Sequence, residues 1–342
     1  MTIRLGINGY GRIGRCVLRA LYESHHRNAM RIVAINDPAD MAAMAHLTRY
    51  DSTHGPFRKK VAFHNDELYV GEDSISVTHS PELDGLPWAD LGVDVLLECS
   101  GVWVRRQDAE KHKAMGAKKV LFSNPAEADV DATVVFGLND ANLSKTDTIV
   151  SNASCTTNCI CHVIDALDKA VGISGGVITT THSVMNDQPV IDAYHHSDLR
   201  RTRCAGFSIV PVETGLARGI DRIFPHLQGC FQAVSLRVPT MNVSMMQLTA
   251  RVEKSVNIRG VNDIIKEAAL PRPSVMGYTE ELLVSCDFNG DARSVIVDGT
   301  QTRVVGNRMV TVLAWFDNEW GYANRMLDTA EVLGRIAEGS SV

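Results

Sequence analysis

One cysteine stands out because of the segments on either side of it. Cys155 follows a short apolar run at residues 148–150 and precedes a helix-like pattern at residues 160–170, so we expect it where a strand gives way to a helix. The first turn of a helix presents unpaired backbone N–H groups and the positive end of the helix dipole. Both favour a thiolate, so the sequence predicts a lowered pKa and a nucleophilic Cys155. A capped helix with a buried thiol is the alternative.

The neighbours of this cysteine suggest what it could bind. Small hydroxyl and amide side chains surround Cys155, and such groups cap helices and donate hydrogen bonds to an anion or oxyanion. Cys159, Cys161 and His162 follow closely, which raises the question of a zinc site. Their spacing lacks the paired CxxC of structural zinc sites, and we therefore expect no metal.

Two further residues could act with the cysteine. His182 comes at the end of a predicted strand at residues 177–181 and is our candidate base, since a nucleophilic thiol commonly requires one. Arg237 lies inside a strongly apolar run, where a charge is costly unless it is paired. A substrate phosphate and a carboxylate of the protein itself are both suitable partners.

A cofactor site is predicted at the start of the chain. A buried strand at residues 3–8 runs into the glycine turn 9–14, a helix follows, and a second strand at residues 31–37 ends on Asp37. Glycines permit a tight turn and close approach to a pyrophosphate at the helix N-terminus. The carboxylate of Asp37 can accept from a ribose and would repel a 2′-phosphate, so we predict NAD over NADP.

Further short apolar runs alternate with helical or loop segments, which predicts a doubly wound, mostly parallel Rossmann-type α/β sheet. These runs are residues 93–99, 119–122, 133–136 and 148–150. Ligands of such sheets bind beyond the carboxyl ends of the strands. Ser100 and Ser123 occupy such ends and are candidates for the nicotinamide side, although turn residues are an equally simple explanation.

The pattern changes near residue 177. Long alternating runs crowd together with few helices between them, which predicts a second, α+β domain on a largely antiparallel sheet. These runs are residues 177–183, 230–238, 243–252, 282–288 and 308–315. A polar and basic segment at residues 187–203 is a candidate functional loop. Residues 321–337 predict a closing helix.

Composition limits the classes of function. The chain has 342 residues, 45% hydrophobic and 22% charged, and a length beyond one typical core predicts two domains. A net charge of −6 argues against nucleic acid and against a polybasic membrane anchor. We find no secretory pattern at the amino terminus and no apolar run of about 18 residues, so we expect a cytoplasmic protein. Its eight cysteines should be mostly free thiols.

These motifs together resemble the glyceraldehyde-3-phosphate dehydrogenase family across essentially the whole chain. The matching segments are residues 7–15, 151–159, 182–183, 198–201, 237–240 and 315–321. The resemblance implies an NAD-binding Rossmann domain at residues 1–154, a catalytic domain at 155–317 and a C-terminal helix at 318–342 that returns to the NAD-binding domain. It also implies that Cys155 attacks an aldehyde, that His182 activates the thiol, and that hydride transfer leaves a thioester.

The resemblance extends to individual positions and to assembly. With the glycine turn included, the expected cofactor contacts are Gly9, Gly11, Arg12, Ile13, Gly14, Asp37, Ser100, Ser123 and Asn318. The expected substrate contacts, most of them to phosphate, are Ser154, Thr156, Arg201, Thr214, Gly215 and Arg237. Family members are generally homotetramers in which the arginine-bearing loop reaches a neighbour's cofactor site.

Departures from the glycolytic pattern bear on the substrate. Where glycolytic members place two phosphate-binding threonines after the histidine, this chain has Met185 and Asp187, which removes a donor and adds a charge that repels phosphate. Glu213 adds another negative charge. Several segments resemble the erythrose-4-phosphate dehydrogenase branch instead, namely residues 185–188, 190–195, 200–203 and 298–304. That branch uses a sugar phosphate one carbon longer, releases the acyl group to water and feeds pyridoxal phosphate synthesis.

We therefore expect NAD-dependent oxidation of D-erythrose 4-phosphate to 4-phospho-D-erythronate, with a sugar phosphate as the partner and neither nucleic acid nor membrane. A phosphorylating glyceraldehyde-3-phosphate dehydrogenase remains open because Ser154, Thr156 and Thr214 persist. A non-catalytic NAD-binding redox sensor that uses Cys155 and Cys159 is a second alternative.

Overall fold

The computed structural model describes residues 2–195 and 198–338 and divides into two compact units. The first unit is Met1–Ser154 with Ala323–Val342, and the second is Cys155–Tyr322. Residues 196–197 of the predicted functional loop, and residues 1 and 339–342 of the predicted terminal domains, lie outside the described residues.

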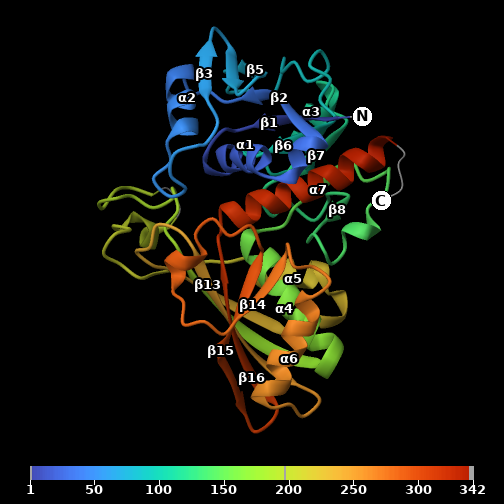
Figure 1. Ribbon diagram of the computed structural model, residues 1–342, viewed down its shortest axis with the longest axis vertical. Coiled ribbons are helices and arrows are strands. Elements are labelled where there is room, and N and C mark those ends of the chain that lie inside the picture. The colour runs from blue at the N-terminus through green and yellow to red at the C-terminus, as the bar shows by residue number, and fades with distance from the viewer. Residues whose placement is uncertain (1, 196–197, 339–342) are drawn as a thin grey trace. The chain divides into compact units, whose positions relative to one another are not determined.

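A nine-stranded sheet, as far as the described residues go, forms the centre of the first unit (Figure 1). Its strand order is β3-β4-β5-β2-β1-β6-β7-β9-β8. The strands are β1 (Ile3–Asn8), β2 (Met30–Asn36), β3 (Val61–His64), β4 (Glu67–Val70), β5 (Asp73–Thr78), β6 (Val95–Glu98), β7 (Lys119–Phe122), β8 (Ala132–Thr133) and β9 (Ile149–Ser151). The helices are α1 (Arg12–Glu23), η1 (His25–Asn28), α2 (Met41–Arg49), α3 (Arg106–Ala114), η2 (Asp140–Asn142) and α7 (Trp320–Glu338), most of which belongs here.

Pairing from β5 through β2, β1, β6, β7, β9 and β8 is parallel, whereas the β3–β4 and β4–β5 pairings are antiparallel. All four residues of β6 and of β7 are buried, as expected for parallel strands that are covered on both faces. Trp88 and Phe122 belong to the core beside them. The predicted doubly wound, mostly parallel α/β sheet is confirmed.

The second unit contains a mixed sheet of seven strands among its described residues, in the order β11-β12-β10-β13-β16-β15-β14. The strands are β10 (Ile173–His182), β11 (Val210–Val212), β12 (Phe231–Arg237), β13 (Ser244–Val252), β14 (Met276–Thr279), β15 (Val295–Val305) and β16 (Met309–Phe316). The helices are α4 (Cys155–Val171), η3 (Leu199–Thr202), α5 (Leu216–Ile223), η4 (Pro225–Leu227), α6 (Ile258–Ala269) and η5 (Ser285–Phe288). Most pairings are antiparallel, as predicted, but β10–β12 and β14–β15 are parallel.

Helices α4, α5 and α6 lie together beside this sheet (Figure 1). Helix α4 is buried over most of its 17 residues, as an apolar helix inside a domain should be. Helix α5 approaches it closely at Gly219, where a Cβ atom would lie 2.9 Å from Oγ1 of Thr157. This packing fixes the helix whose first residue is Cys155.

Two predicted strands are wrong. Residues 282–288 form no strand, because the Asp287 carboxylate accepts from the Val284 N–H and closes the 3₁₀ turn η5, while Phe288 stacks on Trp315. Leu282 and Val284 are exposed, so their apolar character misled the prediction. Of the run at 133–136 only Thr133 lies in a strand, because the Val135 N–H donates to the side chain of Asn139 and forms a turn.

Candidate active site

The start of α4 and the end of β10 bring a thiol and an imidazole together. Cys155 is the first residue of α4 and His182 is the last residue of β10. The Cys155 Sγ atom lies 3.8 Å from Nε2 of His182. The ring of His182 is 5% exposed and meets Phe316 edge-on. Sequence positions 27 residues apart therefore form one thiol–imidazole pair.

A backbone carbonyl orients this imidazole. Nδ1 of His182 lies 2.8 Å from the carbonyl oxygen of Ser183, which can only accept, so Nδ1 carries the proton. The neutral ring then has its lone pair on Nε2, the atom that faces Cys155. This is the tautomer that a general base for the thiol requires.

The pKa values of the pair differ from the sequence prediction. Loss of water around the sulfur raises the pKa of Cys155 to about 11, although the N–H of Thr156 and the charge of Arg237 act in the opposite direction. Burial also lowers the pKa of His182 to about 4, and Arg237 adds to this effect. The expected lowering of the thiol pKa is therefore wrong, because burial outweighs the helix terminus. The resting pair is a neutral thiol and a neutral imidazole.

Two arginines converge on one carboxylate beside the pair. Arg237 ends β12, and the parallel register of β10 and β12 places it opposite His182. Asp187 bonds Nη1 of Arg237 at 2.8 Å and Nη1 of Arg201 at 3.0 Å. The side chain of Arg237 is 9% exposed, whereas those of Arg201 and Asp187 are 25% and 30% exposed. Both predicted phosphate-binding arginines are thus paired with an acid of the protein.

Some buried polar atoms near Asp187 and Arg237 have no hydrogen-bond partner among the described residues. Among the described residues, neither the amide oxygen nor the amide nitrogen of Gln188 makes a hydrogen bond, although the residue is 8% exposed. The Nε atom of Arg237 is likewise unpartnered in the described part of the chain. Buried polar groups are normally satisfied, so these atoms are suited to a polar ligand.

The amide of Asn318 is held by two hydroxyl groups. Its Oδ1 atom accepts from Oγ of Ser183 and from Oγ of Ser244, each at 2.9 Å. Because the carbonyl side of the amide is occupied, its NH₂ group is the side that can donate to a ligand. The sequence analysis named Asn318 but did not identify Ser183 and Ser244 as the residues that orient it.

The remaining predicted substrate residues lie at two helix starts. Ser154 and Thr156 flank Cys155 and are half-buried, and Thr214 and Gly215 immediately precede α5. The Thr214 hydroxyl accepts from the N–H of Leu216, and among the described residues no hydrogen bond joins it to Cys155 or His182. Glu213 is exposed.

The glycine turn of the first unit is built for a closely approaching ligand. Gly9 has a φ of 87°, and a Cβ atom there would lie 2.4 Å from the backbone of Ser100. A Cβ on Gly14 would lie 2.3 Å from the carbonyl oxygen of Gly9, so both positions require glycine. A Cβ on Gly11 would meet nothing within 4 Å, which leaves its backbone open to a pyrophosphate. These residues fit a dinucleotide.

Asp37 and Arg12 border this turn. Asp37 follows β2, is half-buried and accepts from the backbone N–H of Tyr10 at 2.6 Å. Arg12 begins α1 and pairs with Asp51, and although burial opposes it, this contact lowers the Asp51 pKa to about 2. Ile13 is half-buried in the first turn of α1.

A buried chain of side chains crosses the carboxyl ends of four strands, and the sequence analysis missed it. Thr78 donates to Asn36, Asn36 donates to Asn8, and Asn8 donates to Glu98 at 2.6 Å. Glu98 also accepts from the hydroxyl and the N–H of Ser100. The sequence contained a signal for this hydrogen-bonded chain, because Asn8, Asn36 and Glu98 are polar residues that each end an apolar strand.

His112 and Ser123 complete the neighbourhood of Glu98. Trp88 donates to Nδ1 of His112, whose Nε2 atom lies 3.0 Å from Glu98. Ser123 follows β7, and its N–H donates to the Glu98 carbonyl. Ser100 and Ser123 therefore lie at adjacent strand ends, where the sequence analysis expected them.

No helix in the described residues is long and apolar enough to cross a membrane.

A hollow of about 750 Å³ lies on the second unit, at the end of β10 opposite to His182. It is lined by Ser174, Gly176, Thr249, Arg251, Glu253 and Arg308, among others. This hollow contains none of the predicted site residues.

Comparison with protein families agrees with both units. Residues 3–106 match the family model described as the NAD binding domain of glyceraldehyde 3-phosphate dehydrogenase. Residues 154–318 match the model described as its C-terminal domain. NAD is therefore the cofactor, and sugar phosphates are the class of substrate that the family binds. The chain belongs to the glyceraldehyde-3-phosphate dehydrogenase family of NAD-dependent dehydrogenases.

Proposed function

We propose that the protein oxidises D-erythrose 4-phosphate to 4-phospho-D-erythronate in the cytoplasm, for pyridoxal 5′-phosphate synthesis, and that water cleaves its thioester. The observation that carries this proposal is Asp187, which bonds both Arg201 and Arg237. A carboxylate between the two arginines competes with inorganic phosphate for the same donors. Weaker binding of inorganic phosphate leaves water as the acyl acceptor.

The unpartnered amide of Gln188 supports a longer substrate. Its buried oxygen and nitrogen atoms suit a sugar hydroxyl, which can both donate and accept. Gln188 also belongs to the segment that resembles the erythrose-4-phosphate dehydrogenase branch. We propose that the unpartnered Nε of Arg237, with Ser154 and Thr156, contacts substrate oxygens.

In the proposed mechanism, the Cys155 sulfur attacks the aldehyde carbon while Nε2 of His182 takes the thiol proton. The imidazolium can then donate to the oxygen of the tetrahedral adduct. Bound NAD would supply the acceptor for the hydride of the adduct carbon. His182 takes the hydroxyl proton of the adduct back as the hydride leaves and passes it to solvent, so that a thioester on Cys155 and a neutral imidazole result. Water attacks the thioester while His182 takes a proton from the water, and the imidazolium returns this proton to the sulfur as the C–S bond breaks, which restores the thiol.

The proposed roles of the other residues follow from their positions. Gly9, Gly11 and Gly14, with Asp37, would hold the NAD pyrophosphate and ribose, and Asn318 would donate to the nicotinamide amide. We further propose that residues 1–154 and 318–342 serve cofactor binding and that residues 155–317 serve catalysis. Four chains would form the assembly, with the loop that carries Arg201 reaching the cofactor site of a neighbouring subunit.

The test is NADH formation with purified protein and each aldehyde, with and without inorganic phosphate. We expect activity on erythrose 4-phosphate without added phosphate, and none in a Cys155→Ala variant that still binds NAD. A strict phosphate requirement with preference for glyceraldehyde 3-phosphate would instead establish the phosphorylating alternative, which the retained Ser154 and Thr156 leave open. Full activity of Cys155→Ala would refute the thioester itself.

A further inference from the structure

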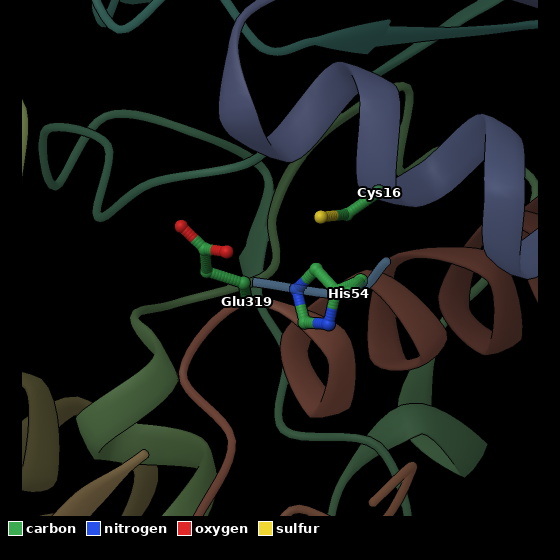
Figure 2. Close-up of side chains that lie close together, drawn as sticks. All are labelled: Cys16, His54 and Glu319. Carbon is green, nitrogen blue, oxygen red and sulfur yellow. The ribbon is translucent and has the colours of Figure 1, made fainter. Parts of the chain in front are cut away.

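Potential metal ligands gather at two places among the described residues. Figure 2 shows one, where Cys16 projects from α1 and His54 from the loop after α2. Glu319, drawn with them, belongs to the second unit, so we base no metal site on this group. The other place lies wholly within the first unit and contains His25, His26 and Glu331.

His25 and His26 form the start of η1, and Glu331 lies on α7. One ligand atom from each of the three lies within 4.8 Å of the others. The two imidazole rings are 4.2 Å apart between centroids, and Nδ1 of His26 is 2.7 Å from Oε2 of Glu331. Zinc requires distances of about 2.0–2.2 Å to nitrogen and oxygen, so small rotations of the side chains would complete the set.

The surroundings of His26 match those of a histidine that binds a metal. Its second nitrogen, Nε2, lies 2.9 Å from Oδ1 of Asp328, and Arg325 in turn contacts the other oxygen of Asp328. Metal-binding histidines almost always donate their other N–H to such a carboxylate, which fixes the ring and makes the ligand nitrogen more basic. His26 is 3% exposed, and carboxylates contact both of its ring nitrogens.

The two oxygens of Glu331 have separate partners. Oε1 contacts Arg335, whereas Oε2 faces His26. A cation bound at Oε2 would therefore leave the contact with Arg335 in place. His25 is exposed, so an ion can enter from solvent and keep a water molecule in a fourth position.

We propose that His25, His26 and Glu331 bind one Zn²⁺ ion. Two imidazole nitrogens and one carboxylate oxygen are a donor set that proteins use for zinc, whereas Mg²⁺ and Ca²⁺ prefer oxygen alone. The bound ion links η1 to α7, and its ligands His26 and Glu331 are 305 positions apart in the chain. Zinc then stabilises the first unit by binding only its folded form. The sequence analysis expected no metal because it weighed only ligands that are close in sequence.

The experiment uses full-length protein with a Cys155→Ala substitution, because the active thiol could itself bind zinc. After removal of metals with a chelator, binding of Zn²⁺ is measured by titration calorimetry and its effect on the melting temperature by scanning calorimetry. We expect one zinc ion per chain and a higher melting temperature. Mg²⁺ at the same concentration should give neither effect.

His25→Ala is the decisive variant, since His25 is exposed and its loss should not prevent folding. We expect zinc affinity at this site to fall at least ~10-fold, the smallest effect usual for a metal-site residue. Glu331→Gln should behave likewise, while His64→Ala, which removes an exposed histidine of β3, should bind zinc as the parent does. Equal zinc affinity and equal melting shift in His25→Ala and in its parent would overturn the proposal.

Discussion

Replacing Asp187 by asparagine tests the proposal that this carboxylate opposes the binding of inorganic phosphate. The carboxylate makes charge-assisted hydrogen bonds of 2.8 Å to Arg237 and 3.0 Å to Arg201. Such a bond contributes about 1.5–3 kcal/mol, and because Asp187 is 30% exposed we take the lower end. A phosphate ion that must displace one of these bonds loses about 1.5 kcal/mol, or roughly tenfold in affinity.

Asp187→Asn should therefore lower the half-saturating phosphate concentration by roughly tenfold. The assay follows NADH formation over a range of phosphate concentrations and separates the acyl phosphate from the free acid among the products. We expect the share of acyl phosphate to increase at each phosphate concentration. Asp192→Asn is the matched control, since this exposed carboxylate of the same loop pairs with Arg203 at 2.9 Å. An unchanged product ratio in Asp187→Asn would refute the reasoning.

The other predictions concern the pair Cys155–His182 and the glycine turn. His182→Asn should lower kcat/KM by roughly 10²-fold. In the parent, kcat/KM should fall on acidification only near pH 4, because His182 must be neutral and its pKa is lowered to about 4. A fall of kcat/KM near pH 6.5 would contradict this. Gly9→Ala should cost about 1–3 kcal/mol in the free energy of unfolding, measured with urea, because its Cβ would meet the backbone of Ser100. Gly11→Ala should keep that stability yet weaken NAD binding in a fluorescence titration, and equal stability of the two variants would count against the steric argument.

Local patterns predicted the cofactor half of the fold well. The strand, glycine turn and helix of residues 3–22 form as expected, because the strand and helix periodicities and the glycine spacing are signals that are local in the sequence. The β3–β5 segment went unassigned, since strands of four to six residues carry little periodicity. The exposed apolar residues before η5 misled the same method, because a single capping carboxylate decided that turn.

Contacts between distant residues were beyond the sequence. The sequence predicted that Asp187 opposes phosphate, but its bond to Arg237 spans 50 positions and required the register of β10 and β12. The serines that hold Asn318 lie 135 and 74 positions from it. Motifs identified the residue types, whereas only the fold gives their partners.

The charge on Asp187 connects substrate choice to the chemistry at His182. Arg237 lowers the pKa of both Cys155 and His182, and Asp187 raises that of His182. A guanidinium without a partner would make His182 a still weaker base, whereas a paired one leaves it better able to accept a proton. An internal carboxylate supplies that partner even when no phosphate is present. In the proposed hydrolysis without inorganic phosphate Asp187 would be this partner, whereas a phosphorylating enzyme would obtain the same effect from its own phosphate substrate.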